Sequence, residues 1–339
     1  MLLWLIVVAA LAGFLMLRAD VSGAVVGRAA GVTLAVAVMF ACGGASSSAT
    51  SVSPTAPTTV VPAAPTLPLA LFFTAFPGHV RTRQNSQFLY VESDGLPDHA
   101  TMVGIRSWQQ QVPLPADYTG SNAWTIPLSP RLADQPVSAR TGLFRGAIAL
   151  AVNGVPIFNA LNNRGDDAFL AGELDDFGGH AGRADDYHYH TAPLFLSSTV
   201  GPTQPIAVAL DGFPIYGGVE PDGSPVRALD EYNGHADAVT TYHYHGTRTY
   251  PYINGGMRGV VSVSDQVEPQ PSLRPVRPAG TPLNGATITR HASTGSNSWT
   301  LQYQLNGRPY TVDYRVDGSR YTFVFTDPSG ATRTETYTR

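Results

Sequence analysis

The sequence predicts an all-β protein, built as a duplicated β-rich domain (sandwich or barrel-like) followed by a small antiparallel β-meander domain. Two observations carry this prediction. The 339 residues include 34 glycines and 27 prolines, and short apolar runs repeatedly end at Asn-Gly or Asp-Gly dipeptides. These dipeptides favour the positive φ of tight hairpin turns. In addition, one stretch of sequence occurs twice, so we expect two similar β-rich units.

The first part of the repeat is a predicted hairpin. IALAVNGVPIF (148–158) matches IAVALDGFPIY (206–216), and each contains an apolar run, a turn dipeptide and a short apolar segment that follows a proline. The second part reads LDDFGGHAGRADDYHYH in the first copy and LDEYNGHADAVTTYHYH in the second. The hairpins are offset by 58 positions and the second parts by 55, so a three-residue length change lies between them. The repeat therefore spans 148–190 and 206–245.

Each copy contains three histidines at the same spacing, although the loops between them differ. The six are His180, His188 and His190 in the first copy, and His235, His243 and His245 in the second. Imidazole is the commonest neutral metal ligand among side chains. Two repeated histidine triplets therefore indicate metal binding.

Strand geometry explains how such a triplet could hold a metal. Residues two apart on a strand project from the same face, so His188 and His190 should point together, with Tyr187 and Tyr189 packed on the opposite face. We expect His180 and His235, each of which follows a glycine, to arrive from loops and complete a three-histidine site with an open position. Asp175 and Asp230 lie five residues before these histidines and are candidates to accept a ring N–H and orient a ligand.

The number of sites stays open at this point. We expect the four histidines of the two Tyr-His-Tyr-His segments to face a common cavity. The sequence does not decide whether the two triplets form two separate sites or one dinuclear site.

These motifs resemble the YHYH-domain family of secreted and cell-surface proteins. The resemblance covers roughly 68–263 and rests on NGVPIF and DGFPIY, on LD followed by GH, on both YHYH segments and on YPYINGGMRG (250–259). Relatives often carry cysteines in the segments where this chain has Phe177, Tyr232 and Gly256, so a disulfide is excluded there. The resemblance implies a secreted or surface protein and assigns no biochemical role.

The N-terminus predicts export to the cell envelope. Residues 27–44 hold Arg28, an apolar run and then Cys42, an arrangement similar to a bacterial lipoprotein signal that is cut before a lipidated cysteine. Cys42 is the single cysteine of the chain. We therefore predict a signal region over 1–42 and an extracytoplasmic protein anchored to the membrane by lipid on Cys42. The first apolar stretch, 1–17, is either upstream of a true start of translation near Val26, which we prefer, or an extra membrane segment.

Composition divides the rest of the chain. Residues 43–67 hold only small, apolar or hydroxylated residues and no charge, as expected of an extended tether. A Pro-rich stretch over 264–282 predicts a linker between the main domain (68–263) and a C-terminal domain (283–339). In that last segment, three turns separate four alternating runs, which predicts a four-stranded antiparallel meander.

Two classes of function follow from these patterns. The first is a surface lipoprotein that binds copper or zinc; the second is a metal-dependent enzyme, hydrolase or oxidoreductase, that activates water or oxygen. The sequence identifies no catalytic residue and does not decide between them. The net charge of −4 without a basic patch argues against a nucleic-acid partner. Four arginines flank the histidine segments and are candidate contacts for an anionic substrate, although most surface arginines have no such role: Arg164, Arg183, Arg248 and Arg258.

Overall fold

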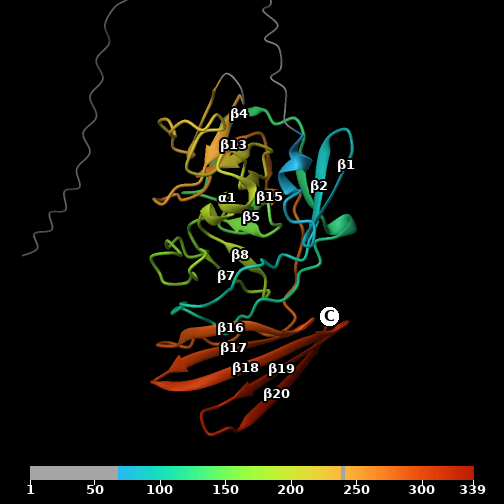
Figure 1. Ribbon diagram of the computed structural model, residues 1–339, viewed down its shortest axis with the longest axis vertical. Coiled ribbons are helices and arrows are strands. Elements are labelled where there is room, and N and C mark those ends of the chain that lie inside the picture. Colours follow the sequence, from blue (N-terminus) through green and yellow to red (C-terminus); the bar gives the residue numbers. More distant parts are fainter. Residues whose placement is uncertain (1–67, 238–240) are drawn as a thin grey trace, which may run out of the picture. The chain divides into compact units, whose positions relative to one another are not determined.

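The computed structural model describes residues 68–237 and 241–339 (Figure 1). The predicted signal region, the tether and Cys42 lie outside this part of the chain. Within it the protein is nearly all β, as predicted. Helical segments are short: 3₁₀ helices at η1 (Leu69–Phe73), η2 (Gly120–Asn122) and η3 (Leu194–Leu196), and the α-helix α1 (Ser197–Val200). Among these residues no helix is both long and apolar enough to cross a membrane.

The two copies of the repeat form one eight-stranded sheet. Its strands in chain order are β5 (Ala147–Ala151), β6 (Pro156–Phe158), β7 (Gly179–Ala181), β8 (Tyr187–Tyr189), β9 (Ala207–Ala209), β10 (Pro214–Tyr216), β11 (Gly234–His235) and β12 (His243–His245). Their order in space is β11-β12-β10-β9-β5-β6-β8-β7. The order of equivalent strands is therefore the same from either edge, and each repeat forms one half of the sheet.

The two halves meet in the middle of the sheet with matching register. β5 and β9 are antiparallel, and Leu150 lies opposite Val208, which is its own counterpart in the second copy. On either side of this pair, Ala149 lies opposite Ala209 and Ala151 opposite Ala207. A local two-fold axis therefore passes between Leu150 and Val208 and relates the two repeats.

The predicted hairpins form at the predicted turns. Gly154 follows Asn153 and joins β5 to β6, and Gly212 follows Asp211 and joins β9 to β10. Both glycines have positive φ, +82° and +93°. Such values are favourable only without a Cβ. β5 is buried along its whole length, which explains its continuous run of apolar residues.

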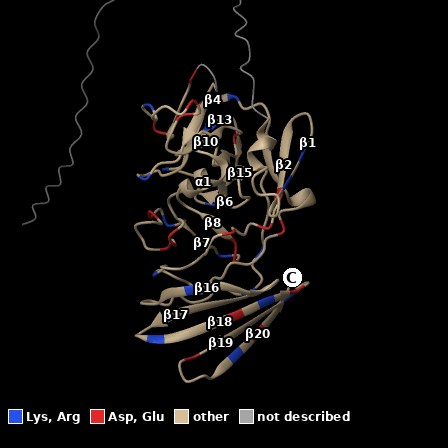
Figure 2. Cartoon of the chain, viewed as in Figure 1, with Lys and Arg blue, Asp and Glu red and all other residues tan. Residues whose placement is uncertain are grey.

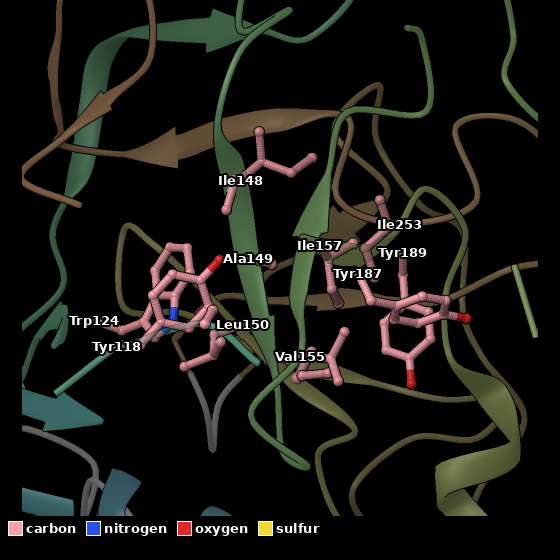
Figure 3. Packing of buried hydrophobic residues seen from close by; sticks show 14 of the residues in the cluster. Tyr118, Trp124, Ile148, Ala149, Leu150, Val155, Ile157, Tyr187, Tyr189 and Ile253 are labelled. Carbon is pink, nitrogen blue, oxygen red and sulfur yellow. The ribbon is translucent and has the colours of Figure 1, made fainter. Parts of the chain in front are cut away.

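Smaller sheets surround this central one. A three-stranded sheet contains β1 (Val80–Gln84), β2 (Phe88–Ser93) and β3 (Trp124–Pro127). There are also two two-stranded sheets. One contains β4 (Leu132–Ser138) and β13 (Gly256–Gly259), and the other contains β14 (Ser262–Val263) and β15 (Val267–Glu268). No sheet of the described residues closes into a barrel. Figure 3 shows the packing of apolar side chains from β5, β6 and β8.

The C-terminal segment is an antiparallel meander of five strands, one more than predicted. They are β16 (Thr287–Gly295), β17 (Ser298–Leu305), β18 (Arg308–Asp317), β19 (Arg320–Thr326) and β20 (Thr332–Thr338), hydrogen-bonded in that order. The last four are the predicted runs. β16 adds to the edge of β17 with two irregularities in its register, which is why its alternation is hard to recognise in the sequence.

The Pro-rich segment between these parts is anchored by polar contacts. Arg277 forms an ion pair with Asp185 at 2.8 Å, and both side chains are buried. Gln270 accepts a hydrogen bond from the backbone N–H of Ala147 at the start of β5. Figure 2 shows acidic and basic residues interspersed over the described chain.

Candidate metal centres

Two short strands bring the first histidine triplet together. β7 and β8 are antiparallel, and His180 lies directly opposite His188. His190 is two residues beyond His188 and projects from the same face, as the spacing predicted. His180 thus comes from a strand rather than the expected loop. The ring of Phe158 stacks on His188 at 3.9 Å between centroids and covers one side of the triplet.

The opposite face of β8 packs into the core, as predicted from the alternation. Tyr187 and Tyr189 are almost completely buried, next to Ile157 and Ile253 (Figure 3). The hydroxyl of Tyr187 donates to Asp175, and that of Tyr189 accepts from the amide of Asn153. The tyrosines therefore fix the strand that presents the histidines.

In the first cluster, the Nε2 atoms of the three histidines converge. The Nε2 of His190 lies 3.1 Å from that of His180 and 3.2 Å from that of His188. On the far side of each ring, Nδ1 of His190 lies 2.5 Å from the carbonyl oxygen of Asn159, and Nδ1 of His188 lies 3.0 Å from that of Asp186. Because a carbonyl oxygen can only accept, these Nδ1 atoms carry the protons. In the neutral forms of His188 and His190, the two Nε2 atoms therefore face each other with lone pairs.

The second cluster repeats this arrangement and adds a carboxylate. His235 on β11 lies opposite His243 on β12, and Nε2 of His235 is 3.3 Å from Nε2 of His245. Nδ1 of His245 lies 2.9 Å from the carbonyl oxygen of Gly217, the counterpart of Asn159. Glu220 completes the group: its carboxylate oxygens lie 3.1 Å from Nε2 of His235 and 3.1 Å from Nε2 of His243.

Burial keeps several of these rings neutral. It is the main cause that lowers the pKa of His190 to about 3 and that of His243 to about 4, and in each case a neighbouring histidine lowers the pKa further. The pKa of His180 is also well below its ordinary value, for the same reasons. Burial alone would raise the pKa of Glu220, but hydrogen bonds from Arg227, then from His243, lower it to about 2. Burial thus favours neutral imidazoles in both clusters, and the second cluster adds an ionised carboxylate.

The two clusters are separate, so the expectation of a common cavity is wrong. β8 and β12 lie near opposite edges of the central sheet, with β6, β5, β9 and β10 between them. Five strand spacings correspond to about 24 Å, whereas the metals of a dinuclear site lie about 4 Å apart. The ligand atoms fall into two compact groups, one in each repeat. The two-fold arrangement of the sheet places the repeats' histidines at its two ends.

Asp175 and Asp230 do not contact the histidine rings. Asp175 accepts hydrogen bonds from the Tyr187 hydroxyl and from the backbone N–H groups of the turn before β7, and Asp230 does the same with Tyr242. The Nδ1 atoms of His188, His190 and His245 lie next to backbone carbonyls instead. Nδ1 of His188 also lies 3.3 Å from the Asp186 carboxylate. The two aspartates orient the strands that bear the histidines, so their effect on the clusters is indirect.

Sequence reasoning did not find Glu220. It lies on the loop after β10, where the repeat continues beyond the matched motif: the bridge between Leu161 and Asp167 has its counterpart between Val219 and Pro225. At the position of Glu220 the first copy has Asn162, whose amide donates to Glu173. Extending the alignment by four residues past Tyr216 would have shown this acidic residue.

A cavity of about 350 Å³ borders the first cluster. All three histidines line it, together with apolar side chains that include Trp108 and Phe158. Of the four arginines that flank the histidine segments, Arg164 and Arg183 line this cavity. Arg258 instead donates to the carbonyl oxygen of Ala133.

Comparisons with known proteins agree with the motifs. Residues 123–227 match the family described as YHYH protein. The matched segment contains the whole first copy of the repeat and the β9–β10 hairpin of the second. No curated protein and no solved structure matches the chain. The chain therefore contains a YHYH-family domain, which confirms the resemblance over residues 123–227.

Proposed function

We propose that this protein binds two divalent metal ions, copper or zinc, one at each histidine cluster. One observation carries the proposal: the Nε2 atoms of His188 and His190 lie 3.2 Å apart with lone pairs facing each other. Two lone pairs at this distance repel each other unless a cation lies between them. A proton on His190 is disfavoured, since burial lowers the pKa of that ring to about 3. A metal ion between the two Nε2 atoms would bind both lone pairs without protonation of either ring.

The distances agree with metal coordination. Zinc binds imidazole nitrogen at about 2.0–2.1 Å, and a tetrahedral arrangement then separates two ligand nitrogens by about 3.3 Å. The Nε2 pairs of the two clusters are separated by 3.1 to 3.3 Å. Backbone carbonyls hold the distal Nδ1 atoms of His188, His190 and His245, which is one of the usual ways in which a ligand histidine is oriented. Copper suits the same donors and binds more tightly where both metals are present.

We further propose that this binding occurs outside the cytoplasm, on a protein anchored to the membrane of the cell envelope by lipid on Cys42. The support is the apolar segment before Cys42 and the uncharged tether that follows it. Such a location would make the protein a metal-binding component of the envelope.

A metal-dependent enzyme is the second candidate, and the cavity beside the first cluster favours it. Three histidine ligands next to a cavity leave a coordination position for water or substrate, as in catalytic zinc sites. The second cluster has a fourth candidate protein ligand, Glu220.

Metal analysis of the full-length, detergent-solubilised protein tests the proposal. After loading with zinc or copper and removal of loosely bound metal, elemental mass spectrometry should detect two equivalents of metal per chain. The matched control changes His188, His190, His243 and His245 to Ala together and should retain none. A wild-type protein that retains no more metal than this control would contradict the proposal.

A further inference from the structure

The two repeats differ at one position that decides how each metal would be coordinated. Glu220 and Asn162 occupy the same place in their copies: the backbone N–H of Glu220 donates to Ser224, and that of Asn162 donates to Asp166, the counterpart of Ser224. The Glu220 carboxylate reaches the second histidine cluster, whereas the Asn162 amide donates to Glu173. The second cluster therefore has four protein ligands and the first has three.

The two clusters also differ in their exposure to solvent, and the first is again the more open one. In the second cluster His243, His245 and Glu220 are almost completely inaccessible. The first cluster borders the cavity of about 350 Å³, which lies within the range of small-molecule sites. A position left free by the protein at the first metal would therefore open into a space large enough for a ligand.

The charges that line this cavity favour an anion. Arg145, Arg164 and Arg183 contribute three positive charges and Glu173 one negative charge. Arg164 already forms ion pairs with Glu173 and Asp166. Arg145 forms an exposed ion pair with Asp265. Arg183 donates to a backbone carbonyl, that of Arg277. A bound divalent metal would add two further positive charges.

The apolar part of the lining suits a ligand with an apolar body. Trp108, Ile105 and Phe158 line the cavity, and Phe158 is the ring that stacks on His188. An apolar body on these side chains would place a charged group close to the histidines.

We propose that the first repeat holds a metal whose open position binds a small organic anion, a carboxylate with an apolar body, while the second repeat holds a closed structural metal. This inference rests on the proposed metal binding and adds a ligand class and a division of roles between the repeats.

Cobalt(II) spectroscopy with benzoate as the probe tests the inference. Cobalt(II) substitutes for zinc, and its visible absorption changes when a ligand enters the coordination sphere. The full-length protein should bind two cobalt ions, and benzoate should shift the absorption of one. The response should disappear when His188 and His190 are changed to Ala. It should persist when His243 and His245 are changed to Ala.

Two milder variants guard against loss of folding. Asn162→Glu together with Glu173→Ala gives the first repeat the residues of the second, since Ala228 occupies the place of Glu173. We expect this variant to keep its cobalt and to lose the benzoate response. Arg183→Gln should weaken benzoate binding about tenfold, as expected for one charge-assisted hydrogen bond. Arg315→Gln on β18, which changes an exposed arginine outside the cavity, is its control.

The possible outcomes separate the two proposals. Two bound cobalt ions with no benzoate response, or with a response from the second cluster, would overturn the inference and leave metal binding intact. An unchanged response in the Asn162→Glu, Glu173→Ala variant would also overturn it. A protein that binds no cobalt would overturn both.

Discussion

The Tyr187 hydroxyl fills the space that a side chain on Gly179 would occupy: a Cβ there would lie 2.5 Å from the hydroxyl oxygen. Gly234 has the same relationship with Tyr242 in the second copy. The glycine that precedes each strand histidine is thus required by the tyrosine that begins the YHYH segment.

Gly179→Ala should displace β7 from β8 and destabilise the protein by about 1–3 kcal/mol, the usual cost of overpacking. Because His180 is the next residue, the variant should also bind the first metal more weakly. Thermal unfolding and metal titration measure the two effects. Gly78→Ala is the control, since a Cβ at Gly78 meets no atom within 4 Å. Equal stability of the two variants would contradict this prediction.

The two metals should bind independently. Changing His188 and His190 to Ala should remove one equivalent of metal and leave the affinity of the other unchanged, because four strands separate the clusters. Competition with a chromophoric chelator measures both affinities. A loss of metal from His243 and His245 in the same variant would show that the sites are coupled.

Glu220→Gln should affect the second site only. It removes the one carboxylate ligand of that cluster, and we expect its metal affinity to fall by more than about tenfold, the smallest loss typical of changes around a metal ligand. Glu173→Gln is the matched control, because Glu173 is a buried carboxylate paired with an arginine and lies outside both ligand groups. If the two variants lose the same metal to the same extent, Glu220 is not a ligand.

The metal-free protein should lose stability in mild acid. The folded state keeps His190 neutral down to a pH of about 3 and His243 down to about 4, whereas the unfolded chain protonates these residues near pH 6.5. The unfolded state therefore binds more protons below pH 6.5, and the free energy of unfolding should fall there by about 1.4 kcal/mol per pH unit for each such histidine. Urea denaturation at pH 7 and pH 5 measures this slope.

His190→Asn should reduce that slope whatever its effect on stability at pH 7. A wild-type slope of zero between pH 7 and pH 5 would show that the metal-free histidines are not held neutral. Zinc should restore stability at pH 7 more than at pH 5, because protons compete with metal for the histidines of the unfolded chain and of the opened site.

The lipid anchor has a direct test. Cys42→Ser removes the sulfur that would carry the lipid, so the protein should accumulate as an unprocessed precursor. Partition between detergent and aqueous phases, together with the mass of the intact protein, detects the change. Wild-type mass and partition in the variant would exclude lipidation at Cys42.

Much of the fold was predictable because its determinants are local. The Asn-Gly and Asp-Gly turns, the alternation of Tyr187 to His190 and the repeat itself each act over a few residues. The separation of the histidine clusters was not predictable in this way. It depends on the pairing of β5 with β9, and two fully buried apolar strands carry no signal that selects one neighbour over another.

In the candidate sites, too, the local features were predictable from the sequence and the non-local contacts were not. The six histidines were identified from their spacing, whereas Glu220 and the partners of the ring nitrogens were not. Glu220 reaches its cluster from the loop after β10, more than ten residues before His235. The partners of His190 and His245 are backbone carbonyls, which every residue possesses and no motif can mark. Asp175 and Asp230, expected beside the rings, are held by the tyrosine hydroxyls instead.

The pairing of Leu150 with its own counterpart Val208 has a consequence for the origin of the domain. A strand that pairs with an identical strand about a two-fold axis makes an isologous contact, which a single type of chain can form with a second copy of itself. An ancestral chain with one repeat could thus have assembled the same eight-stranded sheet as a homodimer, with one histidine triplet in each subunit. Gene duplication and fusion would then have joined two halves that already fitted, and only afterwards could Asn162 and Glu220 diverge.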